Sequence, residues 1–225
     1  MTLARYLIPL LAAAMALPVS AQEAGPDFAE FDGSGGLVFE ADERLILGPL
    51  GAIEFWVAPE WNADPGYEPV VVSNIGPDGP VYLVSVLATR DGIALFSGSN
   101  EAVVAVDFTD DVAHHVAINS YEDGIAVHVD GELKGVFDFS FADLPSYGFF
   151  VGTSDGENGN FVGAIGQLRI WGLPLDEEEI RAFATRNLLS RESGDHPAAP
   201  SLRAVSDFSA SDLLMVDAVA VLPGE

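Results

Sequence analysis

Short runs of β-branched and aromatic residues, each ended by Gly, Pro, Asn or Asp, recur along almost the whole chain. The clearest case is residues 123–139, DGIAVHVDGELKGVFDF, in which two apolar runs flank Asp130-Gly131. Asp and Gly tolerate the positive φ angles that a type I′ turn requires at both central positions. Val127 and Val129 alternate with Ala or His, which is the period of a strand with one buried face. The segment therefore predicts a β-hairpin.

Ten further segments have the same character. They are residues 36–40, 44–48, 52–58, 69–74, 81–87, 93–98, 102–108, 114–121, 147–152 and 162–172. So many short strands, with almost no helical periodicity between them, are typical of two packed sheets rather than of alternating strands and helices. We predict an all-β fold, a two-sheet antiparallel sandwich.

One segment after the last of these runs, residues 175–189, predicts a helix. Asp176 stands at the N-cap position and Glu179 three residues later, which is the pattern of a capping box. Ile180 and Phe183 then fall on one side at helical spacing. We expect this single short C-terminal helix to lie against the edge of the sandwich.

The two ends of the chain differ from its strand-rich middle. Residues 1–21 hold one basic residue, an apolar stretch too short for a stable anchor and small residues before Ala21, which predicts a secretory signal peptide. We therefore expect an exported protein, periplasmic or extracellular, without membrane insertion. Residues 22–186 form the predicted domain. Residues 187–225 form a C-terminal tail that adds an edge strand to its own sheet or to a partner's; we favour its own, because an unpaired apolar edge invites aggregation.

The charge balance excludes two classes of partner. Lys and Arg number 9 against 35 Asp and Glu, so the formal net charge is −26. Such a field repels nucleic acid and anionic lipid surfaces, and we expect neither as a partner. The chain has no cysteine, which excludes disulfides and thiolate metal sites. The oligomeric state stays open.

Four stretches, taken in order, resemble the laminin-G-like, concanavalin A-like lectin/glucanase jelly-roll family. They are residues 29–45 (AEFDGSGGLVFEADERL), 51–59 (GAIEFWVAP), 112–135 (VAHHVAINSYEDGIAVHVDGELKG) and 161–183 (FVGAIGQLRIWGLPLDEEEIRAF). The third contains the His-Val-Ala strand and the Val-Asp-Gly hairpin of the family's central signature. The resemblance implies a concanavalin A-like jelly roll, a fold that serves glycan-cleaving enzymes and binding modules alike.

The chain departs from the family pattern in its closing strand. Many members carry an acidic residue there that holds a structural calcium ion, whereas this chain has Gly166 followed by Gln167. A calcium ion prefers several oxygen ligands, most of them charged. The family's calcium site is therefore not carried over.

The sequence offers no convincing catalytic set. A retaining glycosidase needs two carboxyl groups about 5 Å apart, and the nearest match is Glu40 and Asp42, with Glu43 out of phase. We interpret these as solvated charges and predict that the protein is not an enzyme. His114 and His115 are adjacent, so a strand would point them to opposite faces and they cannot share a metal ion.

A calcium ion has one remaining alternative location. Asp155, Glu157, Asn158 and Asn160 cluster in the segment GTSDGENGNFVG, but without the regular ligand spacing of a calcium loop. An Asn- and Gly-rich turn explains the same residues. We predict no cofactor and no metal, with calcium at this loop as the weaker alternative.

The weak candidate binding site is the Pro- and Gly-broken loop PEWNADPGYEP, which carries Trp61, Asn62, Asp64 and Tyr67. An exposed indole beside short polar groups could stack on a sugar or anchor a protein, although we favour a Trp61 folded back over the sandwich edge. The sequence thus predicts a non-catalytic binding or adhesion module that recognises carbohydrate or a surface protein through rim loops. The alternatives are a glycan-cleaving hydrolase and a structural subunit that pairs through its C-terminal strand.

Overall fold

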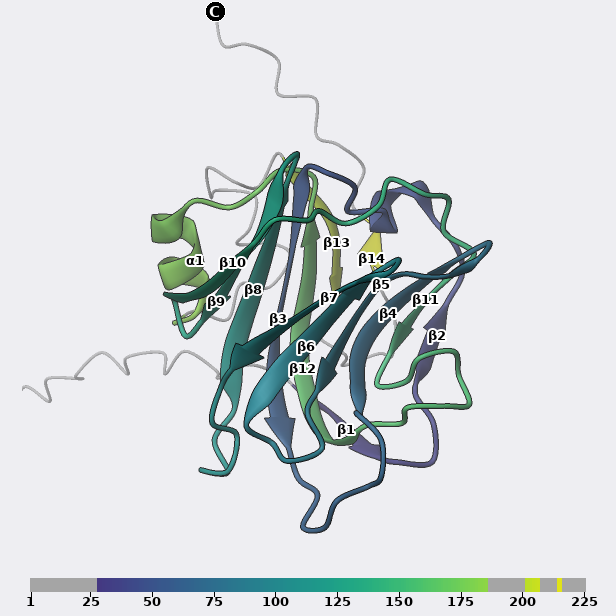
Figure 1. Cartoon of the computed structure of the whole chain (residues 1–225), viewed down its shortest axis with the longest axis vertical. Coiled ribbons are helices and arrows are strands. Elements are labelled where there is room, and N and C mark those ends of the chain that lie inside the picture. The colour runs from purple at the N-terminus through teal and green to yellow at the C-terminus, as the bar shows by residue number, and fades with distance from the viewer. Residues whose placement is uncertain (1–27, 186–200, 207–213, 216–225) are drawn as a thin grey trace, which may run out of the picture.

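The computed structural model describes residues 28–185, 201–206 and 214–215, and within them the strands form two antiparallel sheets (Figure 1). The larger sheet holds eight of the described strands. In spatial order they are β10 (Glu132–Phe137), β9 (Gly124–Val129), β8 (His114–Tyr121), β3 (Gly51–Pro59), β12 (Val162–Trp171), β13 (Leu202–Ser206) and β14 (Leu214–Met215), while β1 (Phe28–Asp32) pairs with β12.

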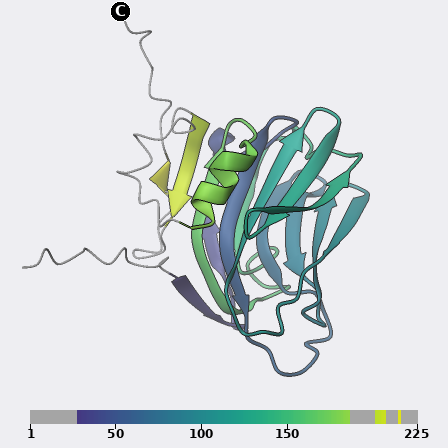
Figure 2. The same ribbon diagram turned by 90° about the vertical axis from the view of Figure 1, so that its left-hand side faces the viewer.

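The smaller sheet, counted over the same described residues, holds six strands. In spatial order they are β2 (Leu37–Phe39), β11 (Gly148–Val151), β4 (Val70–Gly76), β5 (Gly79–Val86), β6 (Gly92–Ser97) and β7 (Asn100–Ala105). A 3₁₀ turn, η1 (Glu43–Leu45), precedes β3, and one helix, α1 (Glu177–Phe183), follows β12. The predicted sandwich with one short helix is confirmed, and Figure 2 shows the helix on the outer side of the larger sheet.

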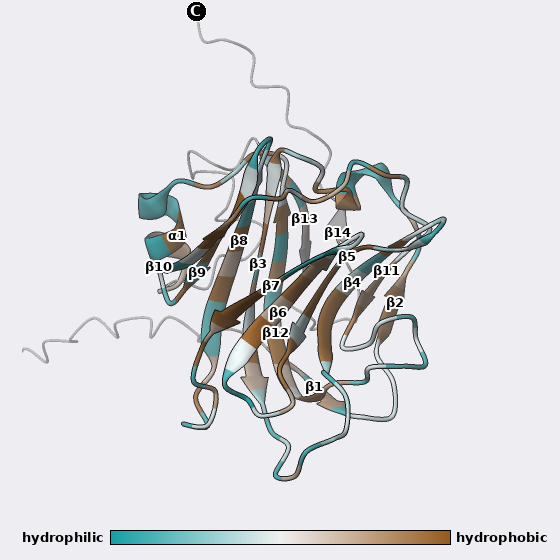
Figure 3. Cartoon of the chain, viewed as in Figure 1, coloured by the Kyte–Doolittle hydropathy of each residue, from teal (hydrophilic) through white to brown (hydrophobic). Residues whose placement is uncertain are grey.

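The space between the sheets is filled by apolar side chains. Strands of both sheets are mostly hydrophobic, while the loop tips are hydrophilic (Figure 3). Ile53, Phe55 and Val57 of β3 face this interior together with Val116 and Ile118 of β8, and all five are fully buried. Their spacing of two shows that one face of each strand builds this core.

The predicted hairpin and the predicted helix cap are both confirmed. Asp130 and Gly131 have φ angles of 52° and 79° between β9 and β10, as a type I′ turn requires. At α1, the Asp176 carboxylate accepts a hydrogen bond from the Glu179 N–H, and the Glu179 carboxylate accepts one from the Asp176 N–H. Both features are local in sequence, which is why the pattern alone reveals them.

One prediction of a strand is wrong. Residues 44–48 were expected as a strand, but η1 forms there because Asp42 accepts a hydrogen bond from the Arg44 N–H and ends the extended chain. The Leu45 carbonyl then accepts hydrogen bonds from Asn74 Nδ2 (3.0 Å) and Tyr82 Oη (3.1 Å), so it needs no strand partner. Residues 202–206 belong to the predicted C-terminal tail, and they form β13, which pairs with β12 in the protein's own larger sheet.

Several predictions lie partly or wholly outside the described residues. The signal peptide, residues 1–21, and the boundary at residue 186 both fall there. Of the predicted tail, β13 and β14 are described, and β14 pairs with β13 at the edge of the protein's own larger sheet. Within the described residues, no helix combines the length and the apolar character needed to cross a membrane.

Candidate functional site

Five connections lie at corresponding ends of the strands, four of them at the lower end in Figure 1 and the β9–β10 turn at the left beside α1; together we call them the lower rim. They are residues 60–69, 87–91, 106–113, 130–131 and 152–161. Hydrogen bonds join four of them. The Phe108 N–H donates to the Arg90 carbonyl (2.9 Å), Trp61 Nε1 donates to the Ala88 carbonyl (2.8 Å), and the Tyr67 hydroxyl donates to the Asn160 carbonyl (2.9 Å). The lower rim is therefore a connected surface of loops held by both sheets, and it contains the loop that the sequence proposed as a binding site.

Trp61 lies inside this rim rather than on it. Its side chain is 8% exposed and belongs to the core, where its ring meets the Phe161 ring edge-on at a centroid distance of 5.7 Å. The indole N–H donates to the Ala88 carbonyl at 2.8 Å. Trp61 is therefore folded back, as the sequence analysis favoured, and it fixes the loop from beneath. The alternative of an exposed indole is wrong, because the ring face is not available for stacking on a ligand.

The other three predicted site residues are exposed, but they do different things. Asp64 accepts a hydrogen bond from the Gly66 N–H at 2.7 Å and so shapes the loop itself. Tyr67, 41% exposed, donates its hydroxyl to the Asn160 carbonyl at 2.9 Å, which ties residues 60–69 to residues 152–161. Asn62 alone lines a concave surface. The structure thus separates two loop-forming residues from one that faces a cleft.

That cleft is small and mostly polar. Its volume is about 240 Å³. Its lining comprises Ala58, Pro59, Glu60, Asn62, Arg90 and Asp111. Three separate connections of the lower rim therefore contribute to it, and we call it the rim cleft.

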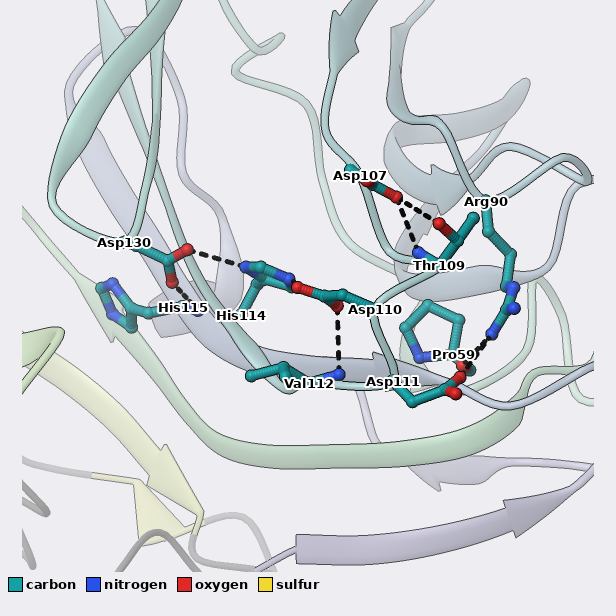
Figure 4. A network of polar contacts seen from close by, with 10 residues as sticks. All are labelled: Pro59, Arg90, Asp107, Thr109, Asp110, Asp111, Val112, His114, His115 and Asp130. Carbon is teal, nitrogen blue, oxygen red and sulfur yellow. Dashed lines mark hydrogen bonds and ion pairs between the residues drawn. The ribbon is translucent and has the colours of Figure 1, made fainter.

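Arg90 contacts two other residues of the rim cleft, Pro59 and Asp111 (Figure 4). Its Nη1 donates to the Pro59 carbonyl at 3.1 Å and lies 3.3 Å from Asp111 Oδ1. Its side chain is 16% exposed, whereas that of Asp111 is 83% exposed. Arg90 and Asp111 also have positive φ angles, 60° and 58°, which are uncommon for such residues and are typical of constrained loop positions.

Charged groups beside the rim cleft are held by local hydrogen bonds. Asp107 accepts from the Thr109 N–H and hydroxyl, and these bonds lower the pKa of the Asp107 carboxyl. Asp110 accepts from the Val112 N–H, which lowers the pKa of the Asp110 carboxyl. Both side chains are therefore ionised acceptors at neutral pH, and they stiffen the connection that presents Asp111.

His114 and His115 point to different surroundings, as their adjacent strand positions predict. His114 Nδ1 lies 2.7 Å from Asp130 Oδ2 at the lower rim, and His114 Nε2 lies 3.3 Å from Asp110 Oδ1 (Figure 4). His115 is fully buried, and its Nε2 lies 3.0 Å from Glu54 Oε2. Over residues 28–185 and the two short C-terminal strands, no group of three His, Asp or Glu side chains is placed to hold a metal ion.

The loop proposed as the calcium alternative uses its carboxylate internally. Asp155 Oδ1 accepts from the backbone N–H groups of Glu157 (3.0 Å) and Asn158 (2.8 Å), and Asp155 Oδ2 accepts from Asn158 Nδ2. The Asn158 side chain and these backbone bonds lower the pKa of the Asp155 carboxyl. This is the geometry of an Asn- and Asp-rich turn that is complete without an ion.

The carboxylates considered for catalysis do not converge. Asp42 forms a bidentate pair with Arg44, with 2.6 Å between Arg44 Nη2 and Asp42 Oδ2, and this pair lowers the pKa of Asp42 to about 2. Glu40 and Glu43 are exposed to solvent. Glu40 and Glu43 are therefore solvated charges, as the sequence analysis interpreted them, whereas Asp42 is paired with Arg44.

Sequence reasoning missed Arg90 and Asp111, which complete the rim cleft. Neither belongs to a recognisable motif, and both reach the cleft through backbone conformations that the residue types do not indicate. The one available signal was Arg90 itself, because it is one of only 9 basic residues in the chain.

Solved structures with the same fold share little sequence with this chain. The carbohydrate-binding module CBM40 of a Ruminococcus gnavus IT-sialidase has a TM-score of 0.56 at 12% identity, covering 70% of this chain and 96% of its own. A heptameric SAP-like pentraxin from Limulus polyphemus has a TM-score of 0.55 at 13% identity, covering 71% and 82%. Domain 4 of the extracellular arabinanase AbnA from Geobacillus stearothermophilus, in complex with arabinotriose, has a TM-score of 0.54 at 19% identity, covering 70% and 76%.

The sequence itself gives the family assignment. No curated protein sequence matches the chain. A family model described as the concanavalin A-like lectin/glucanases superfamily matches residues 33–181, well over half of the chain. These residues include β3, the β8–β10 signature and β12, which lie side by side in the larger sheet. The chain belongs to the concanavalin A-like lectin/glucanases superfamily.

Proposed function

We propose that the protein is a non-catalytic carbohydrate-binding module that acts outside the cytoplasm and recognises its ligand at the rim cleft. The observation that carries this proposal is the set of polar groups that three loops bring to one concave surface. Asn62 supplies an amide donor and acceptor, Arg90 supplies guanidinium donors, and Asp111 supplies carboxylate acceptors. Specific small-molecule sites depend on a few such groups held in fixed positions.

The chemistry of these groups suits sugar hydroxyls. Each hydroxyl donates one hydrogen bond and accepts others, so neighbouring hydroxyls on a ring need donors and acceptors side by side. The rim cleft, at about 240 Å³, is smaller than the roughly 300–1,000 Å³ typical of sites for drug-sized ligands. We therefore expect it to hold one sugar residue of a longer glycan, with the neighbouring residues outside the cleft.

Two structural neighbours support a carbohydrate as the ligand class. One is a carbohydrate-binding module, and another is an arabinanase domain in complex with arabinotriose. Both share the fold of this chain at low identity, so the assignment of the rim cleft itself depends on its lining residues.

The ionisation of the carboxyl groups supports a role without catalysis. A glycosidase of the two-carboxylate type needs a general acid whose pKa is raised. Asp42, Glu54, Asp107, Asp110 and Asp155 all have lowered carboxyl pKa values. Among the described carboxyl groups with a shifted pKa, none is shifted in the direction that a general acid requires.

A glycan array followed by calorimetry with the mature protein tests this proposal. We expect Asn62→Ala to weaken binding of the selected glycan at least tenfold, since it removes a paired amide. Asn100→Ala, at an exposed position of β7, is the matched control and should bind normally. Normal binding by Asn62→Ala would remove the rim cleft from consideration, and release of reducing ends from any polysaccharide would contradict the non-catalytic role.

The export proposal has its own test. The predicted signal peptide ends at Ala21, so N-terminal sequencing of the protein recovered from a secreting host should begin at Gln22. A protein retained in the cytoplasm with residue 1 intact would contradict it.

A further inference from the structure

A second and larger concave surface lies at the opposite end of the sandwich from the rim cleft. Its volume is about 720 Å³, within the range of sites that hold small ligands or peptide segments. We call it the upper cavity; it is lined by residues 41–43, 46–50 and 143–146 and by Arg203. The segment that contributes residues 143–146 crosses the upper end from β10 to β11 (Figure 1).

Hydrogen bonds fix the floor of the upper cavity. The Gly48 carbonyl accepts from the Ser120 hydroxyl at 2.9 Å, and the Ile46 carbonyl accepts from Arg203 Nη1 at 2.9 Å. The neighbouring Leu45 carbonyl is held by two buried side chains of β4 and β5. The cavity is therefore formed before any ligand arrives, which reduces the entropy cost of binding.

Among the described residues that line the cavity, Arg203 is the only basic one. The carboxylate of Asp42, which also lines the cavity, is already paired with Arg44. The positive charge of Arg203 is therefore not balanced by Asp42. The two other acidic residues of the lining, Glu43 and Asp143, are exposed to solvent.

A hydroxyl group adds a second polar anchor. Ser146 Oγ is buried and has no hydrogen-bond partner among the described residues. An unpaired buried hydroxyl is costly, and a ligand atom that accepts or donates a hydrogen bond there would remove the cost. This group is independent of Arg203, because it comes from a different segment of the chain.

The remaining walls are aliphatic. Leu50 and Leu144 are 44% and 45% exposed, and Ile46, Pro49 and Pro145 lie beside them in the lining. None of the described lining residues is aromatic. A sugar ring would find no aromatic face to stack on, whereas an aliphatic side chain would bury its surface and that of the two leucines.

We propose that the upper cavity binds the C-terminal end of an apolar peptide. The peptide carboxylate pairs with the Arg203 guanidinium, and its last aliphatic side chain packs between Leu50 and Leu144. The peptide N–H groups donate to the Asp143 carboxylate, and Ser146 donates its hydroxyl to a peptide carbonyl. A fatty acyl chain offers the same carboxylate but no N–H groups for Asp143 and Glu43, so the lining favours a peptide.

A titration of isotopically labelled protein with acetyl-Ala-Val-Leu as the free acid tests the proposal. We expect the amide resonances of Gly48, Asp143 and Ser146 to shift, because charge-assisted hydrogen bonds and burial form there. The same peptide with a C-terminal amide should bind at least tenfold more weakly, since it loses the carboxylate that Arg203 pairs with. Decanoate should also bind more weakly than the free-acid peptide.

Two exposed leucines give a matched pair of variants that keep the fold intact. Leu144→Asp places a charge in the aliphatic wall and should abolish binding, whereas Leu133→Asp, at a 52% exposed position of β10, should bind as the unaltered protein does. Equal affinity for the acid and the amide would overturn the proposal. So would stronger binding of decanoate, resonance shifts confined to other parts of the protein, or no shift at millimolar peptide.

Discussion

Both faces of the larger sheet are buried at its centre, but they are buried in opposite ways. On the inner face, β3 presents Ile53 and Phe55 to the apolar interior between the sheets. On the outer face, the alternating positions hold Glu54 on β3 and Arg169 on β12, and both side chains are 0% exposed. The inner face is covered by apolar side chains, whereas the outer face buries a pair of charged side chains.

The outer layer is organised around the Glu54 carboxylate. Glu54 Oε1 lies 2.8 Å from Arg169 Nε and accepts from Trp171 Nε1 at 3.1 Å, while Glu54 Oε2 lies 3.0 Å from His115 Nε2. Burial by itself raises the pKa of the Glu54 carboxyl, but Arg169 and His115 more than offset this, and the pKa is lowered. The carboxylate is therefore ionised while fully buried.

The helix α1 closes this outer layer. The Phe183 ring stacks on Trp171 at an interplanar angle of 15°, and the Arg169 guanidinium lies 5.1 Å from the centre of the same Phe183 ring. A cation over an aromatic face adds an attraction that depends on position. The apolar interior tolerates substitutions of similar volume, whereas the outer layer needs particular atoms in particular places, so we expect the two layers to respond differently to mutation.

The largest expected effect comes from breaking the outer charge pair on one side. Arg169→Met leaves Glu54 buried without its cation, and we expect a loss of about 3–5 kcal/mol in the free energy of unfolding, measured by urea denaturation. The double variant Glu54→Gln/Arg169→Met removes both charges and should recover part of this loss. A single variant no less stable than the double variant would contradict the distinction between the two layers.

The inner layer provides the next effect, at Trp61. Because its ring belongs to the apolar core, Trp61→Ala should cost about 3 kcal/mol of unfolding free energy through the cavity that it leaves. Trp61→Phe keeps most of the packing and loses the hydrogen bond to Ala88, so it should cost about 1 kcal/mol. A Trp61→Ala variant of unchanged stability would place the indole outside the core.

The difference between the layers also explains what the sequence could predict. The hairpin turn at Asp130-Gly131 and the cap between Asp176 and Glu179 involve residues at most three apart, so a local pattern reveals them. Alternation along β3 likewise predicts an apolar inner face. The outer pairs are not local: Glu54 and Trp171 lie 117 positions apart. The sequence shows a charged residue within each of the apolar runs that form β3 and β12, but it does not show which residue pairs with it.

The candidate site shows the same difference between local features, which the sequence reveals, and non-local ones, which it does not. The sequence selected the loop that carries Asn62, because Pro and Gly break the strand pattern there. It could not select Arg90 or Asp111, since they reach the rim cleft through the packing of separate loops and through positive φ angles. Periodicity also could not distinguish a buried loop tryptophan from an exposed one, because loops have no regular alternation.

A smaller effect is expected where the outer layer meets the segment before α1. Asn119 Nδ2 donates to the Leu175 carbonyl at 2.7 Å, and Asn119 Oδ1 accepts from the Leu175 N–H at 2.9 Å. Asn119→Ala leaves both backbone groups buried without partners and should cost about 2 kcal/mol of unfolding free energy. Hydrogen exchange should be faster at α1 amides than at β9 amides in this variant. Equal acceleration at both would mean that Asn119 does not act specifically on the helix.

The smallest expected effect comes from His114, which carries a titrating charge at the lower rim and is less buried than the charged side chains of the outer layer. Burial lowers the pKa of His114, but its hydrogen bonds to Asp130 and Asp110 outweigh this, and the pKa is raised. A raised folded-state pKa contributes stability that is fully present below the unfolded value of about 6.5 and is lost as the pH rises through the folded-state pKa.

The variant His114→Gln should therefore be less stable than the unaltered protein by under about 1 kcal/mol at pH ~5.5, because the pair is partly solvated. The difference should shrink as the pH rises through the folded-state pKa of His114, above which His114 is neutral in both states. Urea unfolding at several pH values measures it. A difference that stayed constant with pH would mean that His114 contributes through packing against Phe108, whose ring it meets edge-on at 5.4 Å, and not through its charge.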